Sequence, residues 1–388
     1  MNDYEYLDCY AGSIEEGKLY VVSVLFGIVL EYDLKDFSYK VLAKIDLQDS
    51  LQLVRINSIE KINHFLYMTL WNSWNVFEYD AESKRMEVYG NNLEYIDGEE
   101  LVVKSYMYQD RIWLFPYDLR QKIKIFHVMT KEFTVSISVE AILKQKGYEI
   151  KNGSLICIEI FQEKNKCFLA VYDSPYILEV DLETEKCNIY EVKHNAKIEM
   201  MTCANGQYWL SYRDSKIIER WSPAEGILET YEPQKICIQD EWKYRHMIAY
   251  KEKVIIVPSR DKSIWMIDKR TRQETVLEYS EDIFRVHNKE RWMFYGFVEY
   301  NDKIILLPFS MTHFIVIDPE NQRMESYSGK FDADIINEYY IKPRLPASIL
   351  LENDIFELSK YLDMMSEYSA DMGEGISGTG GKIWMKLR

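Results

Sequence analysis

Histidine, cysteine and serine can bind metals or act as nucleophiles, but none of them occurs here in a spacing that predicts such a site. The six histidines include neither a His-x-His pair nor a His-Glu-x-x-His motif, either of which places two ligands on one element. The six cysteines form no Cys-x-x-Cys pair, and no Gly-x-Ser-x-Gly nucleophile elbow occurs. We therefore expect no metal and no cofactor. One alternative stays open, in which His246, His313 and carboxylates converge from distant parts of the chain.

Glycines near the C-terminus match the dinucleotide-binding fingerprint, in Gly373-Glu-Gly375-Ile-Ser-Gly378. That motif binds a pyrophosphate where it joins a strand to the N-terminus of the next helix. Here a predicted helix precedes the glycines, and Gly380 and Gly381 follow them. We therefore interpret the segment as a flexible linker.

Aromatic, arginine and histidine side chains are concentrated in short segments that follow apolar runs, where loops are ordinarily small and polar. These residue types dominate binding surfaces because they bring a large contact area at low entropic cost. The candidate ligand- or partner-binding residues are Trp71, Trp74, Tyr117, Tyr172, Tyr176, Tyr212, Arg213, Trp242, Arg260 and His313. The alternative for each of them is that it packs against neighbouring loops and makes them rigid.

Two carboxylates in the same segments, Asp118 and Asp173, could serve as general acid and base on a sugar. Tryptophan and tyrosine also stack on sugar rings. These residues define an alternative function, that of a carbohydrate-binding protein or a carbohydrate-active hydrolase or lyase.

The composition restricts the classes of partner that the chain is expected to bind. Its 388 residues carry 47 Lys and Arg against 63 Asp and Glu, a formal charge of −16 that repels nucleic acid and anionic membrane surfaces. No apolar run is long enough to span a membrane, and the first residues do not resemble a signal peptide. We expect a cytoplasmic monomer that binds a protein or carbohydrate ligand.

A pattern that recurs about every 47 residues organises the chain. An apolar strand is followed by a variable loop and then by a second strand that ends in a tight turn. Seven copies can be aligned, with second strands that end at Tyr32-Asp33, Tyr79-Asp80, His127-Val128, Val180-Asp181, Trp221-Ser222, Ile267-Asp268 and Ile317-Asp318. The five aspartates are interpreted as turn residues that accept backbone N–H groups, not as catalytic acids.

Each copy offers four strands. An apolar strand such as Lys303–Leu307 precedes the hairpin, another such as Trp292–Tyr300 comes before it, and a fourth such as Arg323–Tyr327 follows the turn. Four antiparallel strands per unit, repeated radially, predict an all-β protein, a seven-bladed β-propeller. Six or eight blades are the alternatives, because the third and fifth copies lack the aspartate.

The strand that ends in Asp before a turn containing Thr or Ser, as in Asp181-Leu-Glu-Thr184 and Asp268-Lys-Arg-Thr271, resembles the repeats of kelch-type and quinoprotein-like propellers. The resemblance covers residues 4–330 and implies the fold alone. We therefore expect a propeller domain over 1–330. Over 331–388 we expect an amphipathic helix that begins near Asp354, the glycine-rich linker and a short strand at Lys382–Met385, all packing on the propeller. The alternative is that the helix docks a partner, with the chain as a structural part of a larger assembly.

In a propeller, the loops between second and third strands and the loops between blades open on one face, which we call the loop face. The candidate residues lie in these loops. The sequence thus favours a non-catalytic binding scaffold that uses this aromatic and arginine-rich face. No residue is assigned a catalytic role.

Overall fold

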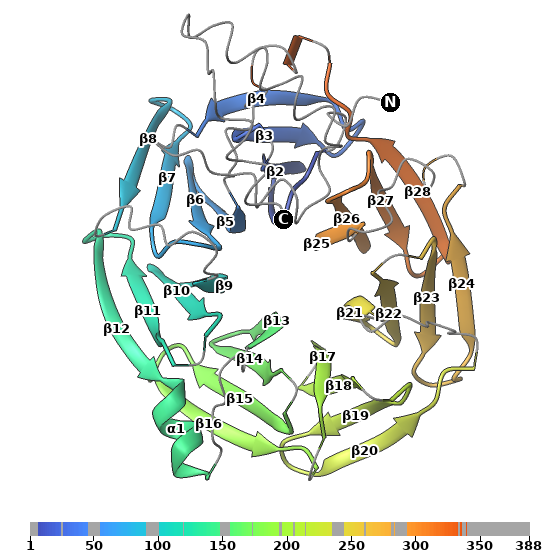
Figure 1. The fold of residues 1–388 in the computed structure, drawn as a ribbon. Helices are drawn as coiled ribbons and strands as arrows, with labels where there is room; N and C mark the ends of the chain where they lie inside the picture. The colour runs from blue at the N-terminus through green and yellow to red at the C-terminus, as the bar shows by residue number, and fades with distance from the viewer. Residues whose placement is uncertain are drawn as a thin grey trace, which may run out of the picture. The chain divides into compact units, whose positions relative to one another are not determined.

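The computed structural model contains seven four-stranded antiparallel sheets arranged around a ring, as predicted (Figure 1). The structure describes residues 7–24, 26–45, 55–90, 101–118, 120–147, 156–172, 174–193, 196–204, 206–213, 215–234, 244–259, 261–280, 283, 293–332, 334–335 and 339. Each sheet is built from four strands that are consecutive in the chain. The third and fifth repeats, which lack the turn aspartate, form complete blades.

The strands of the seven blades have the following bounds. In chain order they are β1 (Gly12–Glu15), β2 (Lys18–Ser23), β3 (Ile28–Asp33) and β4 (Tyr39–Lys44); β5 (Ile56–Ile62), β6 (Phe65–Leu70), β7 (Val76–Asp80) and β8 (Arg85–Tyr89); β9 (Val102–Tyr108), β10 (Arg111–Pro116), β11 (Lys122–His127) and β12 (Glu132–Ser138); β13 (Ile156–Glu163), β14 (Lys166–Val171), β15 (Tyr176–Asp181) and β16 (Lys186–Glu191); β17 (Ile198–Ala204), β18 (Gln207–Tyr212), β19 (Ile218–Ser222) and β20 (Gly226–Tyr231); β21 (Tyr244–Tyr250), β22 (Lys253–Pro258), β23 (Ser263–Asp268) and β24 (Glu274–Glu278); β25 (Phe294–Tyr300), β26 (Lys303–Pro308), β27 (His313–Asp318) and β28 (Arg323–Ser328).

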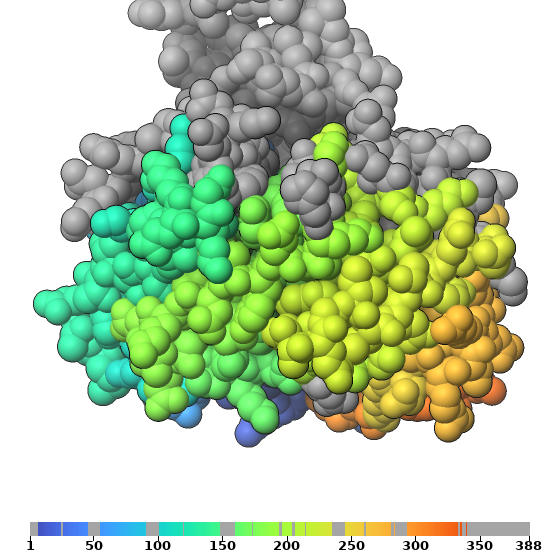
Figure 2. All heavy atoms as spheres, turned by 90° about the horizontal axis from the view of Figure 1, so that it is seen from below, coloured from blue at the N-terminus to red at the C-terminus, as the bar shows by residue number. Residues whose placement is uncertain are grey.

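The second strand of a blade is buried, whereas the fourth strand is exposed to solvent. The run Ile304, Ile305, Leu306 and Leu307 of β26 is buried on both faces, because neighbouring blades cover both sides of the sheet. The fourth strands face solvent, and β28 has exposed residues along most of its length. Figure 2 shows part of this outer surface, where blades three to six lie side by side in colours from green to orange.

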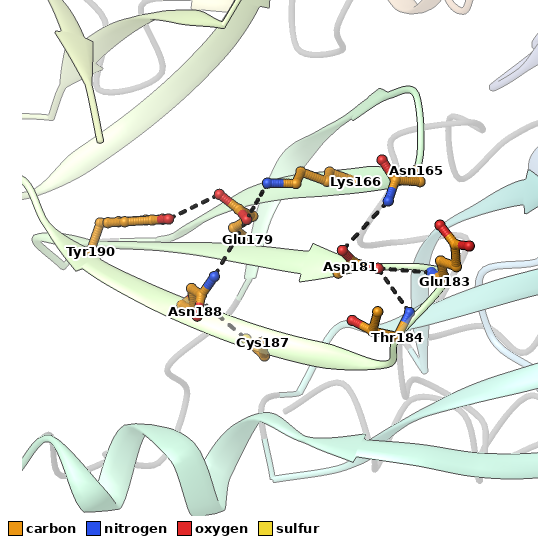
Figure 3. Close-up of polar contacts among 9 residues, drawn as sticks. All are labelled: Asn165, Lys166, Glu179, Asp181, Glu183, Thr184, Cys187, Asn188 and Tyr190. Atoms are coloured by element: carbon orange, nitrogen blue, oxygen red, sulfur yellow. Dashed lines mark hydrogen bonds and ion pairs between the residues drawn. The ribbon is translucent and has the colours of Figure 1, made fainter. Parts of the chain in front are cut away.

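The turn between the third and fourth strands is held by the recurring aspartate, as predicted. Asp181 accepts the backbone N–H groups of Glu183 and Thr184 at 3.0 and 2.8 Å (Figure 3). The bond from the Thr184 N–H is the largest cause of the lowered pKa of Asp181. The same side-chain bond forms at Asp33, Asp80, Asp268 and Asp318. In blade five Ser222 replaces the aspartate and accepts from the Glu225 N–H at 3.1 Å.

The residue four positions after the end of each third strand adopts the left-handed conformation. In six blades it is not a glycine, and φ lies between 52° and 61° at Phe37, Lys84, Lys131, Glu185, Arg272 and Gln322. Blade five has Gly226 there, with φ of 77°. The turn geometry is thus shared by all seven repeats, although the residue types differ.

Side chains connect the innermost strands of neighbouring blades. A hydroxyl on one inner strand accepts a backbone N–H of the next blade at three junctions, which join Ser13 to Lys61, Ser58 to Ser105 and Thr202 to Ala249. The inner strands are edges of their sheets, and their backbone groups need partners where they are buried. The hydroxyls supply those partners and fix the spacing between blades.

The ring closes between the first and seventh blades, and among the described strands none is exchanged between these two sheets. The backbone N–H of Cys9, just before β1, donates to the carbonyl of Pro308 at the end of β26, at 3.1 Å. The Cys9 thiol donates to the same oxygen at 3.3 Å. Leu7, Cys9, Leu307 and Phe314 belong to one buried cluster that spans the junction. Apolar burial together with these bonds therefore holds the ring closed.

Helix α1 (Val139–Gln145) follows β12 and was not predicted from the sequence. Ser138 caps it by accepting the Ala141 N–H, while Val139 and Leu143 are buried against the core of blades three and four. The predicted helix near Asp354, the glycine-rich linker and the strand Lys382–Met385 lie outside the described residues. In the part of the chain that is described, no helix is long and apolar enough to cross a membrane.

Candidate functional site: the loop face and the axial cavity

Five aromatic rings meet where the axis of the ring opens on the loop face. We call this set, formed by Tyr10, Trp71, Tyr117, Tyr295 and Phe309, the axial aromatic cluster. Ring centroids lie 4.2 Å apart for Tyr10 and Tyr295, 5.0 Å for Tyr10 and Phe309, and 5.2 Å for Trp71 and Tyr295. Tyr117 completes the cluster at 6.2 Å from Trp71. The rings come from blades one, two, three and seven, so residues far apart in the sequence form one surface.

Burial divides this cluster into a base and a rim. Trp71 and Tyr295 are only 5% and 7% exposed, whereas Tyr10, Tyr117 and Phe309 are half-buried. The guanidinium of Arg245, on β21, lies 4.0 Å from the Tyr295 ring centroid and donates to the Tyr295 carbonyl at 2.9 Å. The base is therefore fixed by packing and by a charged hydrogen bond, and the rim is accessible.

Three of the candidate residues pack or form hydrogen bonds within the blades. Trp74 packs against the core between blades two and three, with the Lys124 ammonium 4.2 Å from its ring centroid. Tyr212 is buried and donates to Glu219, and Tyr176 packs against the core of blades three and four. These contacts give each of the three a stabilising role in the fold.

Other candidates lie at the rims of their blades. Arg213 lies 5.9 Å from the ring centroid of Tyr172, which joins loops of blades four and five. His313 is hydrogen-bonded to the Thr312 hydroxyl at 2.8 Å, and burial lowers its pKa. Trp242 and Arg260 lie outside the described residues. Of the candidates, Trp71 and Tyr117 share the axial aromatic cluster, and the assignment of the whole set to one binding site stays a prediction.

An axial cavity of about 290 Å³ lies below the axial aromatic cluster, between the inner strands. Tyr10 and Tyr295 line it as well as belonging to the cluster. The charged and titratable lining includes three basic side chains, from Lys104, Arg245 and His246, and one acidic side chain, from Glu60. Arg245 and His246 are 3% and 1% exposed. A strongly acidic protein thus holds a cavity whose charged lining is two cations, Lys104 and Arg245, and one carboxyl, Glu60.

Burial raises the pKa of Glu60 to about 7, while the positive charge of Lys104 acts in the opposite direction. The wall that carries both residues is ordered by a buried polar network. The Thr69 hydroxyl donates to Asn57 at 2.6 Å, and Asn57 donates to the Val102 carbonyl at 2.6 Å. Ser58 donates to the Ser105 carbonyl at 3.0 Å. The backbone that presents Glu60 and Lys104 is therefore held in place.

The carboxylates proposed for sugar chemistry do not form a described pair. Asp118 is held by two bonds from the Arg120 Nε, at 2.9 and 2.7 Å, and its pKa is lowered chiefly by that side chain. A carboxyl kept ionised in this way is poorly suited to donate a proton. Asp173 lies outside the described residues. Within the described ranges, no group of three His, Cys, Asp or Glu side chains is arranged to hold a metal ion.

The sequence placed Phe309 in a segment of the loop face without selecting it as a binding residue, and it did not indicate Tyr10, Tyr295 or Glu60. Tyr295 and Glu60 lie on inner strands, and the sequence pattern does not distinguish them from other residues of a strand. Tyr10 precedes the first recognised strand. The equivalence of the repeats was a usable signal. Tyr295 and Arg245 occupy the same position in the first strands of neighbouring blades, because Tyr295 is the second residue of β25 and Arg245 is the second residue of β21.

Comparisons with known proteins identify the fold. The chain matches no protein-family model, and no curated protein sequence matches it. Among solved structures it is similar to virginiamycin B lyase from Staphylococcus aureus, at 9% identity and a TM-score of 0.54, over 78% of this chain and 92% of that one. It is also similar to YCF48 from Cyanidioschyzon merolae, at 9% identity and 0.59, over 82% and 97%. A structure of YCF48 bound to D1 peptide gives 8% and 0.56, over 79% and 92%.

Proposed function

We propose that this chain is a non-catalytic binding scaffold that holds a protein segment on its loop face, over the axial aromatic cluster. The cluster itself carries the proposal, because it presents half-buried rings of Tyr10, Tyr117 and Phe309 on a buried base of Trp71 and Tyr295. Large aromatic side chains near the centre of a surface are the residues that supply most of the energy of protein interfaces.

Preorganisation supports the same proposal. The rings contact one another at centroid distances from 4.2 to 6.2 Å, and Arg245 braces the ring of Tyr295. A partner that binds here does not have to immobilise flexible side chains, which lowers the entropic cost of association.

The comparisons are compatible with this use of the fold. YCF48 has been solved bound to D1 peptide, although its similarity to this chain extends to the fold alone. The formal charge of −16 disfavours nucleic acid and anionic membranes as partners. We further propose a monomer that acts in the cytoplasm, where thiols such as those of Cys9 and Cys167 stay reduced.

A selection experiment tests the proposal. A library of random peptides displayed on phage is selected against the full chain, and the enriched peptides are synthesised and measured by fluorescence polarisation. We expect peptides that bind the native protein and lose at least tenfold in affinity with Tyr117→Ala or Phe309→Ala.

The matched control is Val276→Ala, which changes an exposed residue on the outer strand β24. It should leave the affinity unchanged. Failure to enrich any peptide, or equal binding by the Tyr117 and Phe309 variants, contradicts the proposal. Saturable binding of an oligosaccharide on a glycan array in place of peptides would favour the carbohydrate alternative.

A further inference from the structure

The axial cavity differs chemically from the loop face above it. Its volume of about 290 Å³ is bordered by the inner strands of several blades, and its lining includes Phe161 and Phe297 as well as the basic side chains. For comparison, an apolar cavity of roughly 150 Å³ holds one benzene molecule. The space therefore suits a compact molecule of one or two rings, not a folded partner.

We propose that the axial cavity binds a small aromatic or cyclic carboxylate, whose acid group is attracted by the positive charges of Arg245 and Lys104. This site is independent of the proposed protein-binding function of the loop face.

Arg245 is built into the site. The residue is 3% exposed, and its guanidinium lies 4.0 Å from the Tyr295 ring centroid and donates to the Tyr295 carbonyl at 2.9 Å. These contacts set the plane of a group whose rigid fork of N–H donors matches a carboxylate. Lys104, from the opposite part of the ring, adds a second positive charge, and its ammonium lies 5.3 Å from the ring centroid of Tyr106.

Aromatic side chains in the wall of the cavity also suit a cyclic carboxylate. Tyr10, Tyr106, Phe161, Tyr295 and Phe297 all line the cavity. Aromatic side chains favour offset or edge-to-face contact with a second ring, so a cyclic body gains more here than an inorganic anion does. The combination of basic and aromatic lining selects an organic acid over phosphate.

Glu60 makes the binding of an anion dependent on pH. The other titratable groups that line the cavity are Lys104 from β9, on the same wall as Glu60, Arg245 and His246 from β21, and the hydroxyl-bearing rings of Tyr10, Tyr106 and Tyr295. When Glu60 is ionised, its charge opposes a bound carboxylate and competes for the same cations. Because its pKa is raised to about 7, a carboxylate should bind more tightly at pH 6 than at pH 8.

Calorimetric titration of the full chain with defined probes tests the site. Benzoate and indole-3-carboxylate are compared with their uncharged amides and with inorganic phosphate, each at pH 6 and pH 8. We expect saturable binding of at least one carboxylate, at least tenfold tighter than its amide and tighter than phosphate. Binding of the amide or of phosphate with equal affinity, or of neither carboxylate at millimolar concentration, overturns the proposal.

Variants connect the binding to these residues. Lys104→Met should weaken the carboxylate at least fivefold, whereas Lys84→Met, on an exposed turn, should not change it. Glu60→Gln should strengthen binding at pH 8 and remove most of the pH dependence, and this gain cannot result from misfolding. An unchanged affinity of Glu60→Gln at pH 8 contradicts the assignment.

Discussion

The carbonyl oxygen of Tyr10 lies 2.5 Å from the point that a Cβ atom at Gly296 would occupy. The seventh blade therefore approaches the segment before β1 so closely that only glycine fits at that position. This close approach places Tyr10 beside Tyr295. The pairing of the two rings therefore depends on the same contact that closes the ring of blades.

Replacement of this glycine should weaken ring closure. Gly296→Ala forces either the backbone near Tyr10 or strand β25 to move, and we expect a loss of about 1–3 kcal/mol in the free energy of unfolding. Urea denaturation followed by circular dichroism measures it. Gly147→Ala, where φ is 80° and nothing lies within 4 Å of the new Cβ, measures the cost of backbone strain without crowding, and Gly296→Ala should cost more than that. Equal stability of Gly296→Ala and the native protein would show that the junction is not close-packed.

Removal of an inter-blade hydroxyl should cost more than removal of an exposed one. Ser58 accepts the Ser105 N–H at 2.9 Å and donates to the Ser105 carbonyl at 3.0 Å, in a buried environment. Ser58→Ala leaves both groups without that partner, so we expect destabilisation of about 1–3 kcal/mol. Ser326→Ala, on the exposed strand β28, should change stability by less than about 0.5 kcal/mol. Similar effects of the two changes would contradict a role for Ser58 in blade spacing.

The turn residues in the left-handed conformation allow backbone strain to be tested without a change in packing. Gly226 has φ of 77°, and nothing lies within 4 Å of a Cβ built there. Gly226→Ala should therefore destabilise the fold by roughly 1 kcal/mol through backbone strain alone. Lys84→Ala, at the equivalent position with φ of 58°, keeps a Cβ and should be nearly neutral. A neutral Gly226→Ala in thermal denaturation would argue against strain at this position.

The turn aspartates should make the fold sensitive to acid. Hydrogen bonds lower the pKa of Asp181 and Asp268 below the ordinary value of 3.8. A group whose pKa is lower in the folded state stabilises the fold above its unfolded pKa, and that contribution is lost as the pH falls through the folded value. We therefore expect the melting temperature to fall steeply below about pH 4.

Asparagine variants isolate this contribution. Asn keeps the acceptor oxygen of the turn but does not titrate, so Asp181→Asn combined with Asp268→Asn should reduce the loss of melting temperature between pH 6 and pH 3. Asp110→Asn, in an exposed turn between β9 and β10, is the matched control. An identical acid profile for the double variant and the native protein would rule out these turns as the cause.

Most of the fold was predictable from the sequence because it repeats locally. The aspartate turns and the apolar second strands depend on residues close together in the chain; the turns recur in five blades and the apolar strands in all seven. The register of the loops also placed Trp71 and Tyr117 on one face before any contact was known.

The axial features were not predictable in the same way, because they depend on contacts across the ring. Tyr10 and Tyr295 are almost the whole length of the propeller apart in sequence, and their rings meet only because the ring closes. Glu60 looks like an ordinary strand residue until the cavity beside it is seen. Helix α1 was missed although Ser138, Val139 and Leu143 carry a cap and an apolar spacing.

The central claim is that the loop face binds a protein segment through the axial aromatic cluster, and the most direct test is the dissociation constant of a selected peptide for the native protein and for Phe309→Ala. Removal of an anchor ring should cost about 2 kcal/mol, or roughly thirtyfold in affinity, in a variant that circular dichroism shows to be folded. An affinity within twofold of the native value, in the folded variant, would contradict the account.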